Sequence, residues 1–339
     1  MAVKFSVATA NTLNLNRPNL PMYRDRQGWL PNEYDNKVGW LVNQLQTVGA
    51  DLWGFQELWH ADALSDLFQT AGLGSQYQLL VPDGHQGRIT CAAAVRNELV
   101  HGQAEWISQF PASFRLASQG DDAQTGALDL DISSFSRPVL HFQIKPHADE
   151  ENVHVYVCHF KSKRPTRIDN EGWYDDAQHK PHRNALGYAI STLRRTAEAV
   201  ALRMILTEQM KHTDTPVIVL GDLNDGQASN TLNILTEQPR FLLDGDARGG
   251  ADNALYSAGT MQQYRSQRDV YYTHVHNNQL ESLDHILLSE QFYDKSRERI
   301  WAFKGLEVFN DHLNDEHYEQ LGATDHGIIK ANFVYKPLD

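Results

Sequence analysis

The hydrophobic pattern of this chain is clearest at Pro216–Asp225, which reads PVIVLGDLND. A short apolar run rich in β-branched residues is typical of a strand that is buried on both faces of a sheet. Gly221 permits a sharp exit, so Asp222 and Asn224 are expected at the strand end, where proteins often carry functional groups. A carboxylate and a carboxamide there can share one polar centre, such as a phosphate, a water or a metal. The alternative is an Asx-rich turn that caps the next helix.

Similar apolar runs predict strands elsewhere, and apolar residues at helical spacing predict helices between them. The predicted strands are Lys4–Leu15, Asp51–Glu57, Tyr77–Val81, Thr90–Val95, Ser136–Ile144, Val153–Phe160, Val217–Leu220 and Gly327–Tyr335, with a hairpin of Val270–His276 and Leu280–Leu288 about Asn277–Asn278. The predicted helices are Tyr34–Val48, ended by Gly49, then Asp62–Thr70, Asn184–Lys211 and Ser229–Leu235. Strands and helices recur in both halves, which indicates two sheets packed together with helices outside.

The remaining segments are polar or rich in proline and glycine, and they are expected to be loops. These are Arg17–Asn32, Lys161–Arg183 and the stretch after the helix at 229–235, through Gly259. Glu105–Asp131 is rich in glycine and acidic residues, and we interpret it, like Lys161–Arg183, as an insertion. The sequence contains no internal repeat or linker, so we predict a single domain over residues 1–339.

The composition is typical of a globular enzyme, with 41% hydrophobic and 22% charged residues. No apolar run approaches the roughly 20 residues that span a bilayer. The N-terminus runs into a strand-like pattern without the regions of a signal peptide, which favours a cytoplasmic location. Cys91 and Cys158 lie in apolar runs and are expected to be buried thiols rather than a disulfide.

The net charge of −13 argues against a protein that coats nucleic acid through bulk electrostatics. The segment Lys161–Arg203 nevertheless carries nine Lys or Arg against five Asp or Glu, a local charge of +4 that leaves −17 for the remainder. A basic face on an acidic protein suits an anionic substrate that is held at one place. Arg194 and Arg195 are interpreted as residues of a solvated helix face.

Polar residues stand at the ends of several predicted strands that are otherwise apolar. They are Asn11, Glu57, His159, Asp222 with Asn224, Asp284 with His285, and Asp325 with His326. Each has a structural alternative: a turn for Asn11, a helix cap for Glu57, a hydrogen-bonded core histidine for His159, and a strand start for Asp325 and His326. Those alternatives would have to hold independently at six places, whereas one shared polar centre accounts for all of them.

The chemistry of these side chains is mutually consistent. Carboxylates with a carboxamide are hard oxygen ligands that suit Mg²⁺ or Mn²⁺, and no Cys/His pattern at zinc spacing is present. Histidines beside carboxylates supply acid–base capacity near neutral pH, and Lys161 adds a fixed positive charge. Together they fit a phosphoryl centre, where catalysis is mainly positioning and charge stabilisation.

The order of motifs points to a family. The segments are ANTLNL at Ala10–Leu15, FQE at Phe55–Glu57, CHFKS at Cys158–Ser162, GDLND at Gly221–Asp225, SLDHILLS at Ser282–Ser289 and TDHG at Thr324–Gly327. This series resembles the endonuclease/exonuclease/phosphatase superfamily, which includes DNase I, exonuclease III and the sphingomyelinases. The resemblance implies a DNase I-like α/β fold of four layers, two central mixed β-sheets flanked by helices, and Mg²⁺-dependent phosphoester hydrolysis.

The resemblance also implies a role for each polar residue. Glu57 would be the principal metal ligand, with Asn11 beside it and Asp325 helping. Asp222 would orient or deprotonate the attacking water, and Asn224 would hold that water and a phosphate oxygen.

The histidines and cations would complete the site. His326, oriented by Asp284, would act as general base or as the partner of the developing charge. His159 would bind the phosphate or assist the leaving group, and Lys161 and Arg137 would face the phosphate. His159 stands where abasic-site endonucleases usually have tyrosine, which disfavours abasic-site repair.

Three functions are therefore weighed. The first is a Mg²⁺- or Mn²⁺-dependent phosphodiesterase or nuclease, in which Lys161–Arg203 contacts the nucleic-acid backbone and Trp173 and Tyr174 stack on a base. The alternative for Trp173 is a loop anchor packed on the sheet. The second function is a phosphatase or phosphodiesterase for a small soluble or lipid-headgroup phosphate, and the third is a non-catalytic binding module on the same fold. The complete set of strand-end residues argues against the third.

Overall fold

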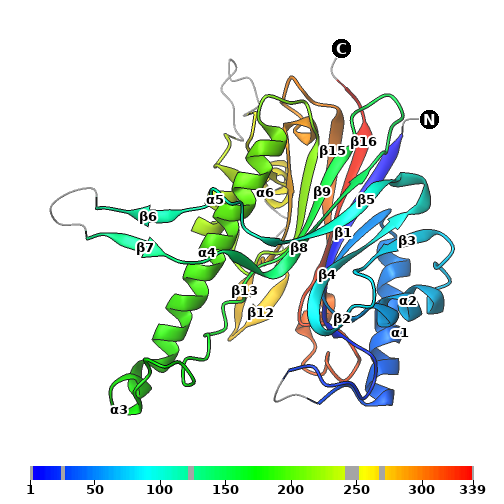
Figure 1. The fold of residues 1–339 in the computed structure, drawn as a ribbon. Helices are drawn as coiled ribbons and strands as arrows, with labels where there is room; N and C mark the ends of the chain where they lie inside the picture. The colour runs from blue at the N-terminus through cyan, green and yellow to red at the C-terminus, as the bar shows by residue number, and fades with distance from the viewer. Residues whose placement is uncertain (1–2, 24–26, 121–125, 241–251, 267–271, 338–339) are drawn as a thin grey trace.

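The protein is represented by a computed structural model, which describes residues 3–23, 27–120, 126–240, 252–266 and 272–337. Two six-stranded sheets form its centre (Figure 1). The first sheet has the order β15-β16-β1-β2-β4-β3. Its strands are β1 (Lys4–Leu15), β2 (Leu52–His60), β3 (Tyr77–Leu80), β4 (Gln86–Arg96), β15 (Trp301–Phe309) and β16 (Ile328–Tyr335). The sheet is mixed, because β1 runs parallel to β2 and antiparallel to β16.

The second sheet has the order β11-β14-β10-β9-β8-β5. Its strands are β5 (Val100–Gln109), β8 (Ser134–Ile144), β9 (Val153–His159), β10 (Val217–Asp222), β11 (Tyr256–Ser257) and β14 (Asp284–Leu288). The central strand β10 runs parallel to β9 and antiparallel to β14, so this sheet is mixed as well. Two small hairpins stand apart from it: β6 (Leu116–Ser118) with β7 (Leu128–Leu130), and β12 (His274–His276) with β13 (Gln279–Glu281).

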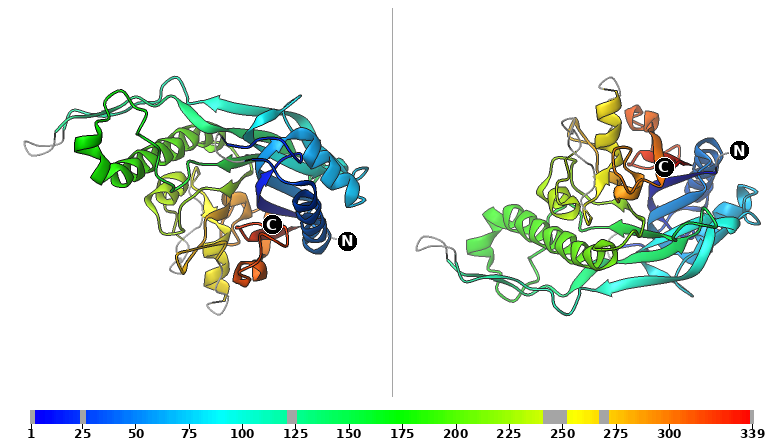
Figure 2. Two further views of the ribbon diagram at one scale, coloured as in Figure 1. Left: turned by 90° about the horizontal axis from the view of Figure 1, so that it is seen from below. Right: turned by 90° about the horizontal axis from the view of Figure 1, so that it is seen from above.

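The described residues form six α-helices, four of which cover the outer faces of the two sheets. They are α1 (Pro31–Val48), α2 (Ala61–Thr70), α3 (Asp176–His179), α4 (Arg183–Met210), α5 (Asn230–Thr236) and α6 (Ala258–Arg265), with short 3-10 turns at Asn97–Leu99, Lys180–His182, Glu290–Phe292 and Asp311–Asn314. Apolar residues of α1 and α2 pack against the first sheet, and those of α4 and α5 against the second. Figure 2 shows these helices on opposite sides of the paired sheets. The predicted four-layer α/β architecture is confirmed.

The core between the sheets consists of inward-facing stripes of apolar side chains. On β10 the inward residues are Ile218 and Leu220, and on β9 they are Val155 and Val157. The sheets approach so closely that a Cβ at Gly54 would clash with the side chain of Leu220. Cys91 and Cys158 are both free and buried, as predicted. Among the described residues, no helix has the length and apolar character required to cross a membrane.

Most predicted elements are present with small shifts at their ends, but several predictions were wrong. The predicted strand Leu280–Leu288 is divided between β13 and β14, because Thr273 Oγ1 accepts hydrogen bonds from the backbone amides of Leu283 and Asp284 and holds the chain in a turn. The strand β15 was not predicted. Its alternation of polar and apolar residues slips at Gly305, where the pairing with β16 changes register.

Three predicted loops contain regular structure. The first residues of Glu105–Asp131 belong to β5, and the rest includes the β6–β7 hairpin that extends from the body in Figure 1. Lys161–Arg183 includes α3 and a 3-10 turn, and the loop through Gly259 ends earlier, at β11 and α6. Parts of these predictions, at 24–26, 121–125, 241–251 and 270–271, lie outside the described residues.

Gly221 lies inside β10 rather than beyond it, at a position where the fold leaves no room for a side chain. Its φ is 139°, and a Cβ there would clash with the backbone carbonyl of Cys158 on β9. We expect Gly221→Ala to lower the free energy of unfolding by about 3 kcal/mol or more, because it combines backbone strain with overpacking. Urea denaturation measures the effect. Gly226→Ala is the matched control, because a Cβ at Gly226 meets nothing within 4 Å; equal stability of the two variants would contradict this account.

Candidate active site

The strand-end residues meet at one edge of the two sheets because they continue the inward-facing stripes of the core. On β10 and β9 the inward apolar positions end at Asp222 and His159, and on the antiparallel strand β14 they begin at Asp284. Each of the three lies an even number of residues from the inward-facing core residues of its strand. The register places Asp222 opposite His159 on one side and opposite Asp284 on the other. All three side chains are buried. The inward-facing positions of these strands therefore form the core and also place three ionisable side chains next to one another.

Asp222 lies at the centre of this group. Its Oδ1 accepts a hydrogen bond of 2.8 Å from the backbone amide of Asn224, and its Oδ2 accepts one of 3.1 Å from Asn11 Nδ2. The second bond joins the two sheets, since Asn11 belongs to β1. Oδ2 also lies 3.5 Å from His159 Nε2 and 3.8 Å from His326 Nε2. Burial raises the pKa of Asp222 to about 7, against the opposing charge of His326.

His326 precedes β16 and is held by Asp284. The Nδ1 of His326 lies 2.8 Å from Asp284 Oδ2, and its Nε2 faces Asp222. Burial alone would lower the pKa of His326, but the carboxylates of Asp284 and Asp222 outweigh it and raise this pKa well above 6.5. The result is an imidazole of fixed orientation between two carboxylates.

Glu57 reaches the site through a distortion of β2. The alternation along β2 directs Gln56 into the core, where it accepts a hydrogen bond of 3.2 Å from Thr9. Glu57 has a φ of 64°, and the pairing with β4 shifts register beside it, which is a bulge that re-aims the side chain. Glu57 Oε2 accepts a 3.0 Å hydrogen bond from the amide of Asn14, and Oε1 lies 4.0 Å from His159 Nε2.

The carboxylate of Glu57 is placed to attract a cation. Burial, followed by the charge of Asp325, raises the pKa of Glu57 above its ordinary value of 4.5. The Glu57 side chain keeps 17% of its surface exposed, so an ion can reach it. The carboxylates of Glu57 and Asp325, with the carboxamide of Asn11, are the kind of oxygen ligands that suit a hard divalent ion.

His159 faces the carboxylates and carries an unmatched polar atom. Its Nε2 approaches the carboxylates of Asp222 and Glu57, which favours the proton on Nε2, and Nδ1 has no hydrogen-bond partner. Burial, together with the charge of Arg137, lowers the pKa of His159 well below 6.5. A neutral imidazole with its N–H directed into the site is a donor for an anionic ligand.

Two cations stand beside His159. Arg137 on β8 donates a hydrogen bond of 2.9 Å from Nη1 to the carbonyl of Phe160, which also accepts one from Asn224 Nδ2. Burial, followed by the charge of Arg137, lowers the pKa of Lys161 from 10.5 to about 8. The charges of Arg137 and Lys161 contribute to the lowered pKa of His159, and that of Arg137 to the lowered pKa of Lys161. The side of the carboxylates on which these residues lie is therefore positive.

The structural alternatives for these residues fail at three positions. Asp222 does form an Asx turn with the amide of Asn224, but the next helix is capped by Ser229. The helix α2 is capped by His60 rather than by Glu57. His159 is not a fully hydrogen-bonded core histidine, since its Nδ1 has no partner. One predicted strand-end residue, His285, does not face the site. It is buried on the opposite face from Asp284, and its Nε2 lies 2.9 Å from the carbonyl of Asp225.

Two residues at the site, Arg195 and His274, were not predicted from the sequence. Arg195 is not part of a solvated face: it is 4% exposed, its Nε lies 3.3 Å from Asp225 Oδ2, and its Nη1 donates to the carbonyl of Lys161. It therefore ties α4 to the loops that follow β9 and β10. His274 on β12 also lies at the site, with its ring centroid 4.8 Å from that of His326. Its only sequence signal was a histidine in the strand of a predicted hairpin.

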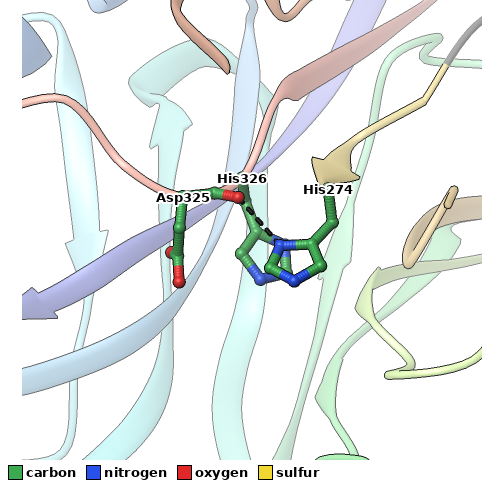
Figure 3. A group of neighbouring side chains, drawn as sticks. All are labelled: His274, Asp325 and His326. Atoms are coloured by element: carbon green, nitrogen blue, oxygen red, sulfur yellow. Dashed lines mark hydrogen bonds between the residues drawn. The ribbon is translucent and has the colours of Figure 1, made fainter. Parts of the chain in front are cut away.

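Several side chains at this edge have metal-ligating atoms close together. His274, Asp325 and His326 form one such group, and Asp222, Asp284 and His326 form another, with the ligand atoms of each group within 4.8 Å of one another. Figure 3 shows the first group, in which the two imidazoles stand side by side and Asp325 lies next to them. The second is the buried carboxylate–histidine chain described above.

Solved structures of similar fold cover nearly the whole chain at low identity. An endonuclease/exonuclease/phosphatase family protein from Bacteroides thetaiotaomicron is 13% identical with a TM-score of 0.53, covering 99% of both chains. A mannosyl-6-phosphatase from the same species is 14% identical with a TM-score of 0.51, covering 98% of this chain and 100% of its own. The human Nocturnin catalytic domain with bound sulfate is 14% identical with a TM-score of 0.53, covering 99% of this chain and 96% of its own. These identities show the fold alone.

Sequence comparison with families is more specific. No curated protein matches the chain. The sequence model of the Endonuclease/Exonuclease/phosphatase family matches residues 9–326, a span that contains every residue of the site from Asn11 to His326. The chain therefore belongs to the endonuclease/exonuclease/phosphatase family.

Proposed function

We propose that this chain is a divalent-metal-dependent phosphodiesterase that cleaves P–O bonds of nucleic acid by in-line attack of water. The observation that carries the proposal is the convergence of Glu57, Asp222 and His326 from distant parts of the chain on one edge of the sheets. Glu57 and Asp222 both lie near His159 Nε2, and His326 faces Asp222. A binding module without catalysis would not require buried ionisable groups in this arrangement.

The metal would be held by Glu57, Asn11 and Asp325. The residues fit a hard divalent ion, Mg²⁺ or Mn²⁺, because a cation offsets the burial and the charge of Asp325 that raise the pKa of Glu57. When bound, such an ion supplies positive charge to a phosphate oxygen and makes the phosphorus more electrophilic.

The proton of the attacking water would pass to Asp222, while Asn224 holds the water and a phosphate oxygen. The water oxygen bonds to phosphorus as the bond to the leaving oxygen breaks. His326, held by Asp284, stands within 3.8 Å of Asp222 and stabilises the charge that develops. A carboxyl group with a pKa of about 7 is suited to general base catalysis near neutral pH.

His159, Lys161 and Arg137 would bind the phosphate, and Lys161 gives this role a pH dependence. The lysine is charged below its pKa of about 8 and neutral above it. We expect kcat/KM with Mg²⁺ to fall about fivefold between pH 7 and pH 9, because the roughly tenfold loss of this charge outweighs the roughly twofold gain from full ionisation of Asp222. In Lys161→Arg the fall should disappear, because arginine keeps its charge. An identical alkaline decline in both proteins, measured with bis-p-nitrophenyl phosphate, would assign it to another group.

Nucleic acid is favoured as substrate by the arm formed by residues 161–194. The helix α4 has 28 residues and is about 42 Å long, whereas Arg195 already contacts Lys161 at the end of β9. The preceding turns of α4 therefore extend past the sheet, and Figure 1 shows them reaching α3 beyond the strands. The loop is fixed to them, since Ser191 Oγ donates to the carbonyl of Arg164.

The surface of the arm combines basic and aromatic side chains. Arg164 and Arg183 are exposed. Trp173 is 52% exposed and contacts Tyr174 and His179, so it is not the sheet-packed anchor considered as an alternative. Cations for phosphates beside an open aromatic face are the combination that binds single strands.

The exposed position of Trp173 predicts that its removal weakens the binding of nucleic acid but not of a small substrate. Trp173→Ala should raise KM for single-stranded DNA or RNA about tenfold, the value of one stacked base, and leave turnover of bis-p-nitrophenyl phosphate unchanged. Tyr264→Ala removes a similarly exposed aromatic residue from α6 and serves as the control. A loss of both activities, or of neither, would argue against a stacking role.

A phosphatase or phosphodiesterase acting on a small soluble or lipid-headgroup phosphate is the second candidate, and one solved structure of similar fold is a mannosyl-6-phosphatase. One assay separates the two. Single-stranded DNA, duplex DNA, RNA, bis-p-nitrophenyl phosphate and phosphomonoesters are compared with Mg²⁺, with Mn²⁺ and with chelator. Metal-dependent cleavage of DNA or RNA supports the proposal, whereas turnover of the small diester or of monoesters without cleavage of nucleic acid supports the second candidate. Inactivity on every substrate with either metal would overturn the hydrolase assignment.

A further inference from the structure

His274 is a residue at the site to which neither the motifs nor the proposed mechanism assigns a role. It lies on β12, in the small hairpin, and not on either large sheet. Its Nδ1 lies 2.9 Å from the backbone carbonyl of Asp325, and its ring lies 4.8 Å from that of His326. Figure 3 shows this bond and the two neighbouring rings.

The hydrogen bond to Asp325 determines which nitrogen of His274 is available. A carbonyl oxygen can only accept, so Nδ1 carries the proton and donates it. The lone pair is then on Nε2. Metal-binding histidines are commonly fixed in this way, with one ring nitrogen donating to a carbonyl and the other binding the ion.

The hairpin is attached firmly to the segment that carries Asp325. The backbone amide of Gly327 donates a 2.7 Å hydrogen bond to the carbonyl of Thr273, and His274 pairs with His326 in an antiparallel bridge. Thr273 Oγ1 also binds the amide of Asp284. The imidazole of His274 is therefore positioned by the same backbone that positions the catalytic candidates.

A ring nitrogen of His274 lies among the metal-ligand candidates. One ligand atom each of His274, Asp325 and His326 lies within 4.8 Å of the others. Asp325 is also near enough to Glu57 for its charge to raise the pKa of Glu57. His274 and the Asp325 carboxylate thus border one region, and the charge of Asp325 acts on Glu57.

We propose that His274 is a metal ligand of this centre, binding through Nε2 beside the Asp325 carboxylate, and that it makes the site prefer Mn²⁺ over Mg²⁺. The inference rests on the proposed function, because it concerns the same site. Mg²⁺ is bound almost entirely by oxygen, whereas imidazole suits transition metals. A centre built only of Glu57, Asn11 and Asp325 would lack this selectivity.

The test measures the nitrogen ligand directly on the full chain. Metal is removed with chelator, Mn²⁺ is added back, and pulsed electron paramagnetic resonance detects nitrogen bound to the ion. Wild type should show nitrogen coupling. His274→Gln should lose it or reduce it clearly and bind Mn²⁺ about tenfold or more weakly, since even outer partners of metal ligands contribute that much. Mg²⁺ affinity should change by less than about twofold.

Two further variants keep the result interpretable. His276→Gln alters an exposed histidine of the same hairpin and should behave as wild type. His274→Glu supplies a carboxylate oxygen in place of the imidazole, so it should bind Mn²⁺ without the coupling contributed by His274. It also covers the case in which His274→Gln fails to fold, which circular dichroism reveals.

The outcomes separate the inference from the proposed function. Unchanged nitrogen coupling and Mn²⁺ affinity in His274→Gln would overturn the inference while leaving the metal centre intact. Bound Mn²⁺ without nitrogen coupling in wild type would also overturn it. A wild type that binds neither ion would overturn both proposals.

Discussion

Asp222→Asn and His326→Gln are each expected to reduce kcat for bis-p-nitrophenyl phosphate by about 10³-fold or more, the range for loss of a general base or of a charge-stabilising group. Asparagine can still accept the hydrogen bond of 2.8 Å from the amide of Asn224, but it cannot take a proton. Glutamine retains a donor for Asp284 yet removes the imidazole that lies 3.8 Å from Asp222. Steady-state kinetics with saturating Mg²⁺ measure the loss.

Both substitutions keep a polar group at the buried position, so the fold should persist. Removing His326 altogether would leave Asp284 buried without its partner, and one oxygen of that carboxylate already has no hydrogen bond. His154→Gln is the matched control, since His154 lies on β9 with His159 but at the opposite end of the strand. Near-normal turnover in both Asp222→Asn and His326→Gln would refute the assigned site.

Glu57→Gln should abolish metal-dependent turnover and at the same time stabilise the metal-free protein. The folded pKa of Glu57 is raised above 4.5, so the folded state binds its proton more tightly than the unfolded state does. The metal-free wild type therefore loses stability as pH rises above 4.5 until the folded carboxyl group is also ionised. Glutamine does not ionise and avoids this loss. We expect a higher Tm for the variant at pH 7 without metal.

Metal addition should reverse the order of stability. Mg²⁺ or Mn²⁺ stabilises a protein that binds it only when folded, so wild type should show a Tm increase that Glu57→Gln lacks. Turnover should fall about 10³-fold or more, since the ion supplies transition-state charge stabilisation. Glu316→Gln, at an exposed position, should match wild type in both respects. Equal Mg²⁺-induced shifts in wild type and Glu57→Gln would show that the ion binds elsewhere.

Much of the second sheet's contribution to the site could be predicted, because it follows from periodicity. The alternation on β9, β10 and β14 leads from core residues to His159, Asp222 and Asp284 without interruption. A buried apolar strand that ends in an ionisable group already contains the information that the group faces inward.

The first sheet was less predictable, because Glu57 reaches the site against the alternation. Continuing β2 from Gly54 places Gln56 inward and Glu57 outward; the bulge at Glu57, with φ of 64°, reverses this. A non-glycine residue in that conformation costs energy that local preference would not predict. The strand-end position and the family motif indicated a role for Glu57, but not the bulge that brings it to the site.

Residues that act through distant partners were missed. Arg195 occupies a helix position that local pattern assigns to solvent, but Asp225 and the carbonyl of Lys161 approach it from two other segments. His274 lies at the site because its hairpin pairs with the segment at His326. Neither contact can be predicted from the spacing of hydrophobic and polar residues nearby in the sequence.

The most direct measurement is anomalous diffraction from a crystal of the wild-type chain soaked in Mn²⁺. The account predicts a manganese peak at bonding distance, about 2.2 Å, from a carboxylate oxygen of Glu57, with Asp222 and His326 lining the same site. A peak bound elsewhere, with Glu57 turned away from Asp222 and His326, would contradict it.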